Sequence, residues 1–410
     1  MPTKTNSKRD RTLVGVVFLD GLGFGIVVPI LPFVVLSYNG SASVVTLFVG
    51  LYAAASFLGS AYAGDLSDRF GRRKLISYSL IGSVLAYAGM SAIELLPSTL
   101  VLTILFLLRF ITGLMTGRDA IVRATVTDDQ PDQEHLKMIA TVSAAYGVGA
   151  VLGPGLPSIA LFFVAEDANY YALIFMVASV ASLVAFAMLR VTWGKEDTPQ
   201  REAKPEVRID RVVAVRSVGL PLILTFLGVF AFSTVISITA LFGNEVFGWS
   251  AMQIGWVMVI VSLFVVIARV LLVRLASEWF GEKRAMLLAV LVGVMSLIIT
   301  ATSVEPIQFV LGLILVSTSM AVFTVFTDTV VSREAPVEFR GFLLGASQAV
   351  AAGALFFGAI LNGIMFEYVG YSAGYYLGAG LLFVAVPILI ISPFPFLVAI
   401  DRNVGPSTSE

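Results

Sequence analysis

The residues best placed to do chemistry in this chain are charged residues inside long apolar stretches. Asp20 lies within the stretch 13–37, and Arg109 lies near the middle of the stretch 98–118. A charge inside a membrane-spanning segment is costly, so such a residue is a candidate for a functional site. Removal from water disfavours the charged form of a carboxylate, which suits Asp20 to bind and release a proton near neutral pH.

Asp20 and Arg109 reach similar depths when residues are counted from opposite ends of their helices, at about 1.5 Å of rise per residue. The sequence therefore predicts a buried, water-lined pair whose partners change as a proton moves. The alternative is that Asp20 only holds a structural arginine.

Other reactive groups are scarce. The chain has no cysteine and a single histidine, His135, which excludes disulfides and thiol catalysis and argues against a zinc site. No Walker-type glycine-rich loop is present to use ATP, and a net charge of −1 argues against a nucleic-acid partner. We therefore predict neither an enzyme nor a cofactor, and energy that comes from a proton gradient.

The elements that position the charged residues are long apolar helices. The chain is 58% hydrophobic and 13% charged, whereas soluble domains carry roughly 25% charged residues. Stretches of about 20 mostly apolar residues, long enough to cross a bilayer, occur at twelve places: 13–37, 44–64, 75–96, 98–118, 137–161, 169–190, 217–242, 251–273, 284–302, 306–328, 341–365 and 371–398. The prediction is an all-α membrane protein with twelve transmembrane helices in two pseudo-symmetric six-helix bundles.

Charge and repetition define the domains. We predict an N-terminal bundle at 1–191, a charged cytoplasmic linker at 192–216 and a C-terminal bundle with a short tail at 217–410. Lys and Arg are absent from the six predicted outer connections, so the positive-inside rule places both termini in the cytoplasm of a cell-membrane protein. The loop 67–74 is echoed by 277–284 at the same place in the second half, which suggests duplication.

The segment 64–74 reads Gly-Asp-Leu-Ser-Asp-Arg-Phe-Gly-Arg-Arg-Lys and resembles the signature loop between helices 2 and 3 of the major facilitator superfamily. The resemblance implies an inner gate in which Asp68 faces the N-terminal end of the eleventh helix near Gly341, and Arg72 pairs with Asp128. The other residues of this inner gate are Gly64, Gly71 and Arg73. The alternative is a loop that is merely positive on its inner side.

Two further segments resemble the drug:proton antiporter group of that family, which includes tetracycline and multidrug efflux proteins. One is Asp20–Pro32 in the first helix, and the other is a Gly-x-x-x-Gly-Pro motif in the fifth helix. The motif residues are Gly149, Gly153 and Pro154. The resemblance also implies a part in proton transfer for Arg109. In the fifth-helix motif, the usual closing glycine pair is replaced by Pro157-Ser158. The alternative for this motif is close glycine packing without a functional meaning.

Three more charged residues follow Arg109 along the chain. Arg118 falls on nearly the opposite side of the helix, near the expected inner interface, where a long side chain can snorkel. Asp119 and Arg123 are spaced to pair along the helix or to line the inner vestibule, and both readings stay open. The sequence also leaves three charged residues without an assigned role: Glu94, Arg269 and Asp328.

The middle of the second half is apolar, aromatic or weakly polar, which suits an adaptable cavity for a lipophilic or amphipathic substrate. The predicted cavity residues are Phe24, Phe230, Gln348, Phe357 and Asn362. We predict a monomeric, proton-coupled antiporter that exports a small lipophilic or amphipathic compound by alternating access, with the bilayer, the substrate and protons as its partners. The alternatives are a symporter or uniporter of a metabolite such as a sugar, a lipid mover, or a non-transporting membrane sensor.

Overall fold

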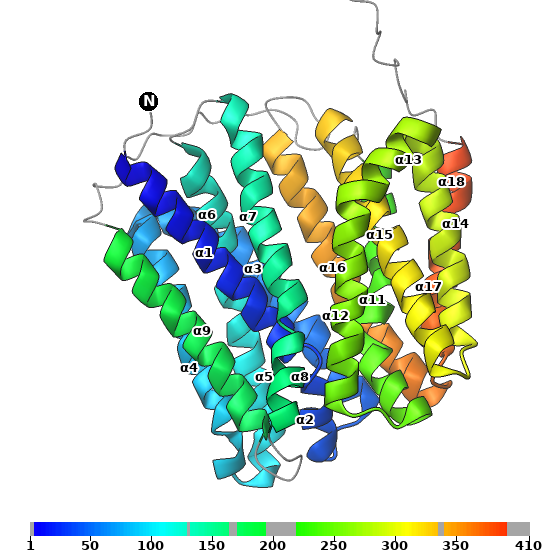
Figure 1. Cartoon of the computed structure of the whole chain (residues 1–410), viewed down its shortest axis with the longest axis horizontal. Helices are drawn as coiled ribbons and strands as arrows, with labels where there is room; N and C mark the ends of the chain where they lie inside the picture. The colour runs from blue at the N-terminus through cyan, green and yellow to red at the C-terminus, as the bar shows by residue number, and fades with distance from the viewer. Residues whose placement is uncertain (1–3, 129–131, 164–169, 194–218, 335–339, 392–410) are drawn as a thin grey trace, which may run out of the picture.

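The computed structural model describes residues 4–128, 132–163, 170–193, 219–334 and 340–391, apart from some side chains within the helices. These residues form helices that run side by side along one direction, without a strand in the described ranges (Figure 1). The predicted linker 192–216 falls almost entirely outside the described residues. The domain boundaries built on that linker therefore stay a prediction.

Six spanning elements make up the first half. Its helices are α1 (Lys4–Val27), α2 (Leu31–Ser37), α3 (Ala42–Phe70), α4 (Arg72–Ser91), the short η1 (Ile93–Leu95), α5 (Ser98–Met115), α6 (Arg118–Asp128), α7 (Asp132–Leu152), α8 (Gly155–Phe163) and α9 (Tyr170–Thr192). Three spans are broken in two, and glycine or proline stands at each break. Proline removes a backbone donor and bends a helix, as at the Gly153-Pro154 break between α7 and α8.

The second half repeats the plan. Its helices are α11 (Gly219–Phe247), α12 (Ala251–Ile267), the π-helical η2 (Ala268–Leu272), α13 (Val273–Phe280), α14 (Glu282–Ala301), α15 (Pro306–Glu334), α16 (Arg340–Tyr368), α17 (Ala373–Phe383) and α18 (Ala385–Ile391). Gly71 (φ 89°) separates α3 from α4, and Gly281 (φ 72°) separates α13 from α14. A left-handed glycine at the same place in each half agrees with the repeated loop read from the sequence.

Eleven helices of the described residues are long and apolar enough to cross a membrane. α4 supplies the twelfth span, because it is as long as a spanning helix needs to be. It is less apolar than the other eleven, since it begins with three basic residues and carries several serines. Two of these, Ser77 and Ser79, hydrogen-bond to carbonyls one turn back, those of Arg73 and Leu75, at 2.8 and 3.0 Å. Such bonds satisfy a hydroxyl inside a helix. The predicted all-α fold with twelve spanning helices is confirmed.

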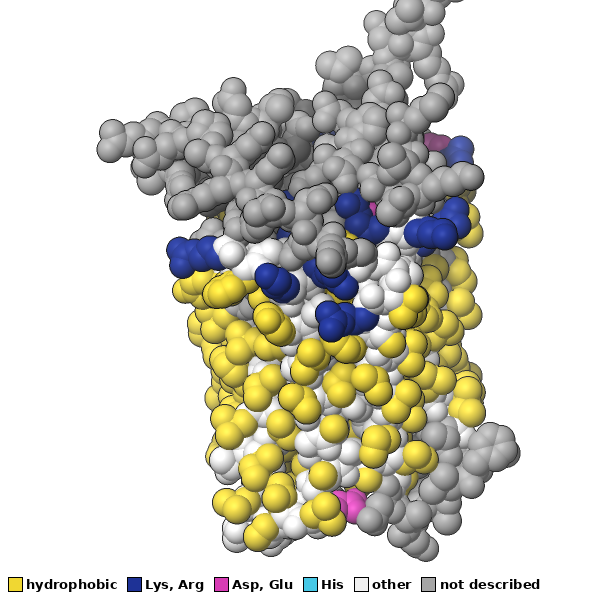
Figure 2. Space-filling model, turned by 90° about the vertical axis from the view of Figure 1, so that its left-hand side faces the viewer, with side chains coloured by type: hydrophobic (Ala, Val, Ile, Leu, Met, Phe, Trp, Pro, Cys, Tyr) yellow, Lys and Arg dark blue, Asp and Glu magenta, His cyan; other side chains and the backbone are white. Residues whose placement is uncertain are grey.

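Large apolar side chains cover the outside of the bundle, and charge gathers at its ends. Figure 2 shows hydrophobic side chains over most of one side and Lys and Arg near the end that carries the N-terminus. We call this end the N-terminal face and the other end the opposite face. Leu85, Leu107 and Leu263 are among the large side chains that are more than half exposed. An apolar belt of this extent fits a bilayer rather than water.

The two halves contact each other mainly through α3 with α16 and through α8 with α12. The Ser158 hydroxyl donates to the carbonyl of Met252 at 3.2 Å, and the Ser43 N–H donates to the Glu367 carboxylate at 3.0 Å. Both contacts lie near the opposite face, where α3 and α12 begin and α8 and α16 end. The halves are therefore joined at the opposite face in this conformation.

Candidate proton-coupling site and central cavity

α1 and α7 cross so closely that glycine is required at their contact. A Cβ on Gly153 would lie 2.6 Å from the Cα of Gly25, and a Cβ on Gly149 would lie 2.7 Å from the backbone nitrogen of Leu22. Real Cβ atoms do not approach so closely, so a side chain would push the helices apart. Gly149, Gly153 and the neighbouring Pro154, which is buried, therefore fix how α1 presents Asp20 to the bundle.

The break between α5 and α6 is held against α3. The hydroxyls of Thr116 and Ser56 are 2.7 Å apart, and Gly117 packs on the backbone of Gly59 without room for a side chain. Two neighbouring residues then follow at the start of α6 with different surroundings. Arg118 is buried inside the first half, whereas Asp119 lines the central cavity.

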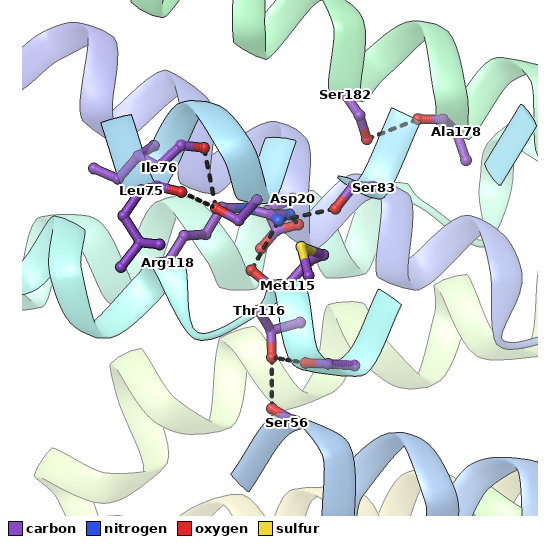
Figure 3. A network of polar contacts seen from close by, with 12 residues as sticks. Asp20, Ser56, Leu75, Ile76, Ser83, Met115, Thr116, Arg118, Ala178 and Ser182 are labelled. Carbon is purple, nitrogen blue, oxygen red and sulfur yellow. Dashed lines mark hydrogen bonds and ion pairs between the residues drawn. The ribbon is translucent and has the colours of Figure 1, made fainter. Parts of the chain in front are cut away.

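Asp20 forms a buried ion pair with Arg118, between α1 and α6 (Figure 3). The Arg118 side chain is 2% exposed and that of Asp20 is 8% exposed. The Arg118 Nη1 donates to the Ser83 hydroxyl of α4 at 2.9 Å and to the Met115 carbonyl at 3.0 Å. Oδ2 of Asp20 accepts no hydrogen bond from the described residues.

This pair corrects two expectations. The arginine that neutralises Asp20 is Arg118 and not Arg109, and Arg118 does not snorkel to the interface. The reason is the length of the span, which was predicted at 98–118 but runs through α5 and α6 to Asp128. Arg118 is thus well inside the bundle rather than at its edge.

Arg109 is buried separately, in the wall of the cavity. Its side chain is among the largest fully buried ones, and its guanidinium carbon lies 4.1 Å from the centroid of the Tyr52 ring. Nε and Nη1 of Arg109 have no hydrogen-bond partner among the described residues. The ring of Tyr52 therefore provides a cation–π contact where no carboxylate of the described residues pairs with this arginine.

The central cavity lies between the two halves and has a volume of about 920 Å³. The first half contributes four aromatic rings, those of Phe24, Tyr52, Phe57 and Tyr146, and the charged side chains that line the cavity: Arg109, Asp119 and Arg123. The second half contributes mostly small residues of α16: Gly345, Ala346, Ala349, Ala351 and Ala352. The cavity is thus charged and aromatic on one wall and smooth on the other, a size and lining typical of small-molecule sites.

Two of the five predicted cavity residues, Phe24 and Gln348, line this cavity. The other three do not. Phe230 is 3% exposed and packs on Phe226, and Asn362 is buried and donates to the Ser233 hydroxyl at 2.9 Å. Phe357 is 56% exposed on the outer side of α16. The prediction fails for these three because depth along a helix was estimated, but not which side of the helix faces the cavity.

The predicted inner gate is described in part. Arg72 and Arg73 stand half-buried at the start of α4, directly after Gly71. The surroundings of Gly64 and the side chains of Asp68 and Asp128 lie outside the described residues. The second half has an ion pair at the corresponding place, because Glu282 at the start of α14 and Arg333 in the last turn of α15 are 2.7 Å apart. That pair has the charges of the predicted Arg72–Asp128 pair in reverse.

Asp119 and Arg123 line the cavity, one of the two readings that the sequence left open, whereas Tyr52 and Tyr146 are cavity residues that the sequence did not single out. One signal was available for the smooth wall, because Gly345, Ala349 and Ala352 recur at helical spacing beside Gln348 and mark one side of α16. No comparable pattern marks the aromatic wall, since its rings come from three different helices.

Two six-helix halves around a central cavity define a polytopic membrane transporter. The chain matches the profile of the Major Facilitator Superfamily over residues 13–304 and 221–403. This chain belongs to that superfamily, whose transporters act on small-molecule substrates in the membrane.

Relatives and solved structures agree with the assignment. The class C tetracycline resistance protein of Escherichia coli is 28% identical over 284 residues, 67% of this chain and 69% of that protein. Multidrug resistance protein 2 of Bacillus subtilis (strain 168) is 24% identical over 363 residues, 87% of this chain and 88% of that protein. The crystal structure of a D-xylose–proton symporter is 18% identical, with a TM-score of 0.76 over 96% of this chain and 98% of the other, which shows a shared fold.

Proposed function

We propose that this chain is a proton-coupled antiporter that exports a small lipophilic or amphipathic compound by alternating access. The observation that carries the proposal is the buried Asp20–Arg118 pair, held beside a central cavity by the glycine contact between α1 and α7. A buried ion pair is costly, so its place beside the cavity marks a site where proton exchange can be coupled to a change of partner. Relatives named for tetracycline and multidrug resistance support export.

In this proposal, charged residues of the first half couple the proton, and both walls of the cavity contact the substrate. Asp20 and Arg109 belong to the proton-coupling residues, with Arg118 as the partner of Asp20. The aromatic rings and the smooth wall of α16 would accept an apolar or amphipathic compound without a demand for one fixed shape. The protein works as a monomer, with no cofactor, and takes its energy from the proton gradient.

Orientation and gating complete the proposal. Because basic residues gather at the N-terminal face, this face would be cytoplasmic in the cell membrane, together with both termini. The inner gate consists of Gly64, Asp68, Gly71, Arg72, Arg73 and Asp128. The reversed Glu282–Arg333 pair of the second half supports an ion pair between Arg72 and Asp128 at this gate.

The test uses protein in liposomes with an imposed pH gradient. Internal pH is followed while tetraphenylphosphonium, ethidium, tetracycline and uncharged lipophilic compounds are added in turn. We expect at least one compound to release protons from loaded vesicles with wild type but not with Asp20→Asn. Glu305→Gln, a change at an exposed acid on the opposite face, is the matched control and keeps the wild-type response.

The same assay decides against the alternatives. Compound movement without any pH response in the wild type would contradict antiport and make a uniporter the better description. Proton entry in the same direction as a metabolite such as a sugar would identify a symporter, and no movement of any compound would favour a sensor.

A further inference from the structure

A second carboxylate, Asp119, stands next to the buried pair but faces the cavity. It lines the cavity one residue beyond Arg118, and its side chain is partly exposed there. Oδ1 of Asp119 accepts no hydrogen bond from the described residues. Asp20 does not line the cavity and is neutralised by Arg118. Of the two acids, Asp119 is therefore the one that borders the cavity.

The groups around Asp119 come from several helices. Its own helix contributes Arg118 and, one turn later, the exposed Arg123. Two tyrosines, Tyr52 of α3 and Tyr146 of α7, lie close enough to interact with its charge. Beyond them, α5 contributes Arg109 to the same cavity, and α16 faces the cavity with uncharged residues. Asp20 of α1 lies behind Arg118, outside the cavity lining.

Arg118 has a defined partner in this arrangement. Its guanidinium pairs with Asp20 and donates through Nη1 to Ser83 and Met115, which holds it away from the cavity. The charges of Arg118 and Arg123 act on Asp119, but the ion pair of Arg118 is with Asp20. If the Asp20 pair opened, Arg118 could form an ion pair with the neighbouring Asp119. Two carboxylates beside one arginine titrate as a coupled set. An ion pair favours the charged form of a carboxylate, so the acid that is not in the ion pair is the easier one to protonate.

We propose that Asp119 is the carboxylate that exchanges the proton with the cavity, and that Asp20 is a positioning residue that stays ionised and holds Arg118. The proposal rests on the proposed antiport and narrows it to one residue. Each exchange converts the Asp119 carboxylate and one proton into the neutral acid, and the reverse step returns the proton to the cavity. Loss of Asp20 would free Arg118 to pair with Asp119, which would block that exchange.

The test reads protonation directly and needs no substrate. Infrared difference spectra of the full chain in lipid are recorded on acidification between about pH 8 and pH 5, above the range in which exposed carboxyls titrate. We expect the band of a protonated carboxylic acid in wild type, its loss in Asp119→Asn, and its retention in Glu305→Gln. Asp119→Glu should keep a band at a shifted position, which separates loss of the acid from loss of the fold.

A double variant tests the role of Asp20. In Asp20→Asn with Arg118→Gln, the competing arginine is gone, so Asp119 should still show the band. A band that persists in Asp119→Asn, a wild type without a band, or a correctly folded double variant without one would each overturn the proposal. Failure of the liposome assay with an Asp119 band intact would instead contradict antiport and leave the assignment of the protonated residue standing.

Discussion

At the scale of single residues, the central feature is the buried ion pair between Asp20 of the first helix and Arg118. Arg118 is buried and bonds to Asp20, Ser83 and Met115. Removing one partner of such a pair leaves the other charge buried without compensation. Breaking the pair is therefore expected to destabilise the protein by more than the intact pair stabilises it, and the pair contributes mainly to conformational specificity.

Arg118→Gln is expected to destabilise the protein by about 3–5 kcal/mol, because Asp20 would remain buried and unpaired. Asp20→Asn with Arg118→Gln should recover most of that loss, since neither charge is then left alone. Thermal unfolding in detergent of the wild type, the two single variants and the double variant measures the coupling between the residues. A double variant no more stable than Arg118→Gln would show that the two side chains do not act as a pair.

Sequence alone could find Asp20 but not its partner. An acid in an apolar stretch is conspicuous because of its cost, and the same argument marks Arg109. The choice between Arg109 and Arg118 depends on where the helix ends and on the break at Thr116–Gly117, and neither is encoded in hydropathy. Asp119 was visible, but its access to the cavity follows from the packing of α6 against α3.

At the scale of elements, the contact between α1 and α7 sets the position of the acid. Two glycines of each helix meet there, Gly21 and Gly25 against Gly149 and Gly153. The sequence indicated close packing from the glycine spacing, and the structure adds which helix is the partner. The spans themselves could be predicted because each needs about 20 apolar residues. The breaks inside them were harder, since proline and glycine bend some membrane helices and leave others continuous.

Gly149→Ala is expected to destabilise the protein by about 1–3 kcal/mol, because the new methyl group would overlap the backbone of α1 near Phe18 and Leu22. Gly147→Ala is a matched control two residues away, where a Cβ would meet nothing within 4 Å. That change should be neutral or slightly stabilising, since alanine favours a helix. Melting temperatures in the same detergent compare the two. Equal effects of both substitutions would contradict the packing role of Gly149.

At the scale of the whole molecule, the two halves are joined near the opposite face and enclose a cavity between them. Glu367 of α16 accepts a hydrogen bond from the backbone of Ser43, in the first turn of α3. A carboxylate is favoured at a helix N-terminus by the helix dipole and by free N–H groups. The contact crosses from one half to the other, so it acts as a latch that favours the conformation closed at the opposite face.

Glu367→Gln should weaken this latch, because a neutral amide interacts less with the N-terminus of α3 than a carboxylate does. The population that opens at the opposite face is then expected to rise severalfold. The chain has no cysteine, so Ala349→Cys on the smooth wall of the cavity provides a single reactive site in the native background. A membrane-impermeant maleimide added to intact cells should label this site faster in Glu367→Gln than in the parent, while Glu305→Gln leaves the rate unchanged. Equal labelling rates in all three backgrounds would mean that the Ser43–Glu367 contact does not control opening, and the joint between α8 and α12 would then be the one that holds the halves together.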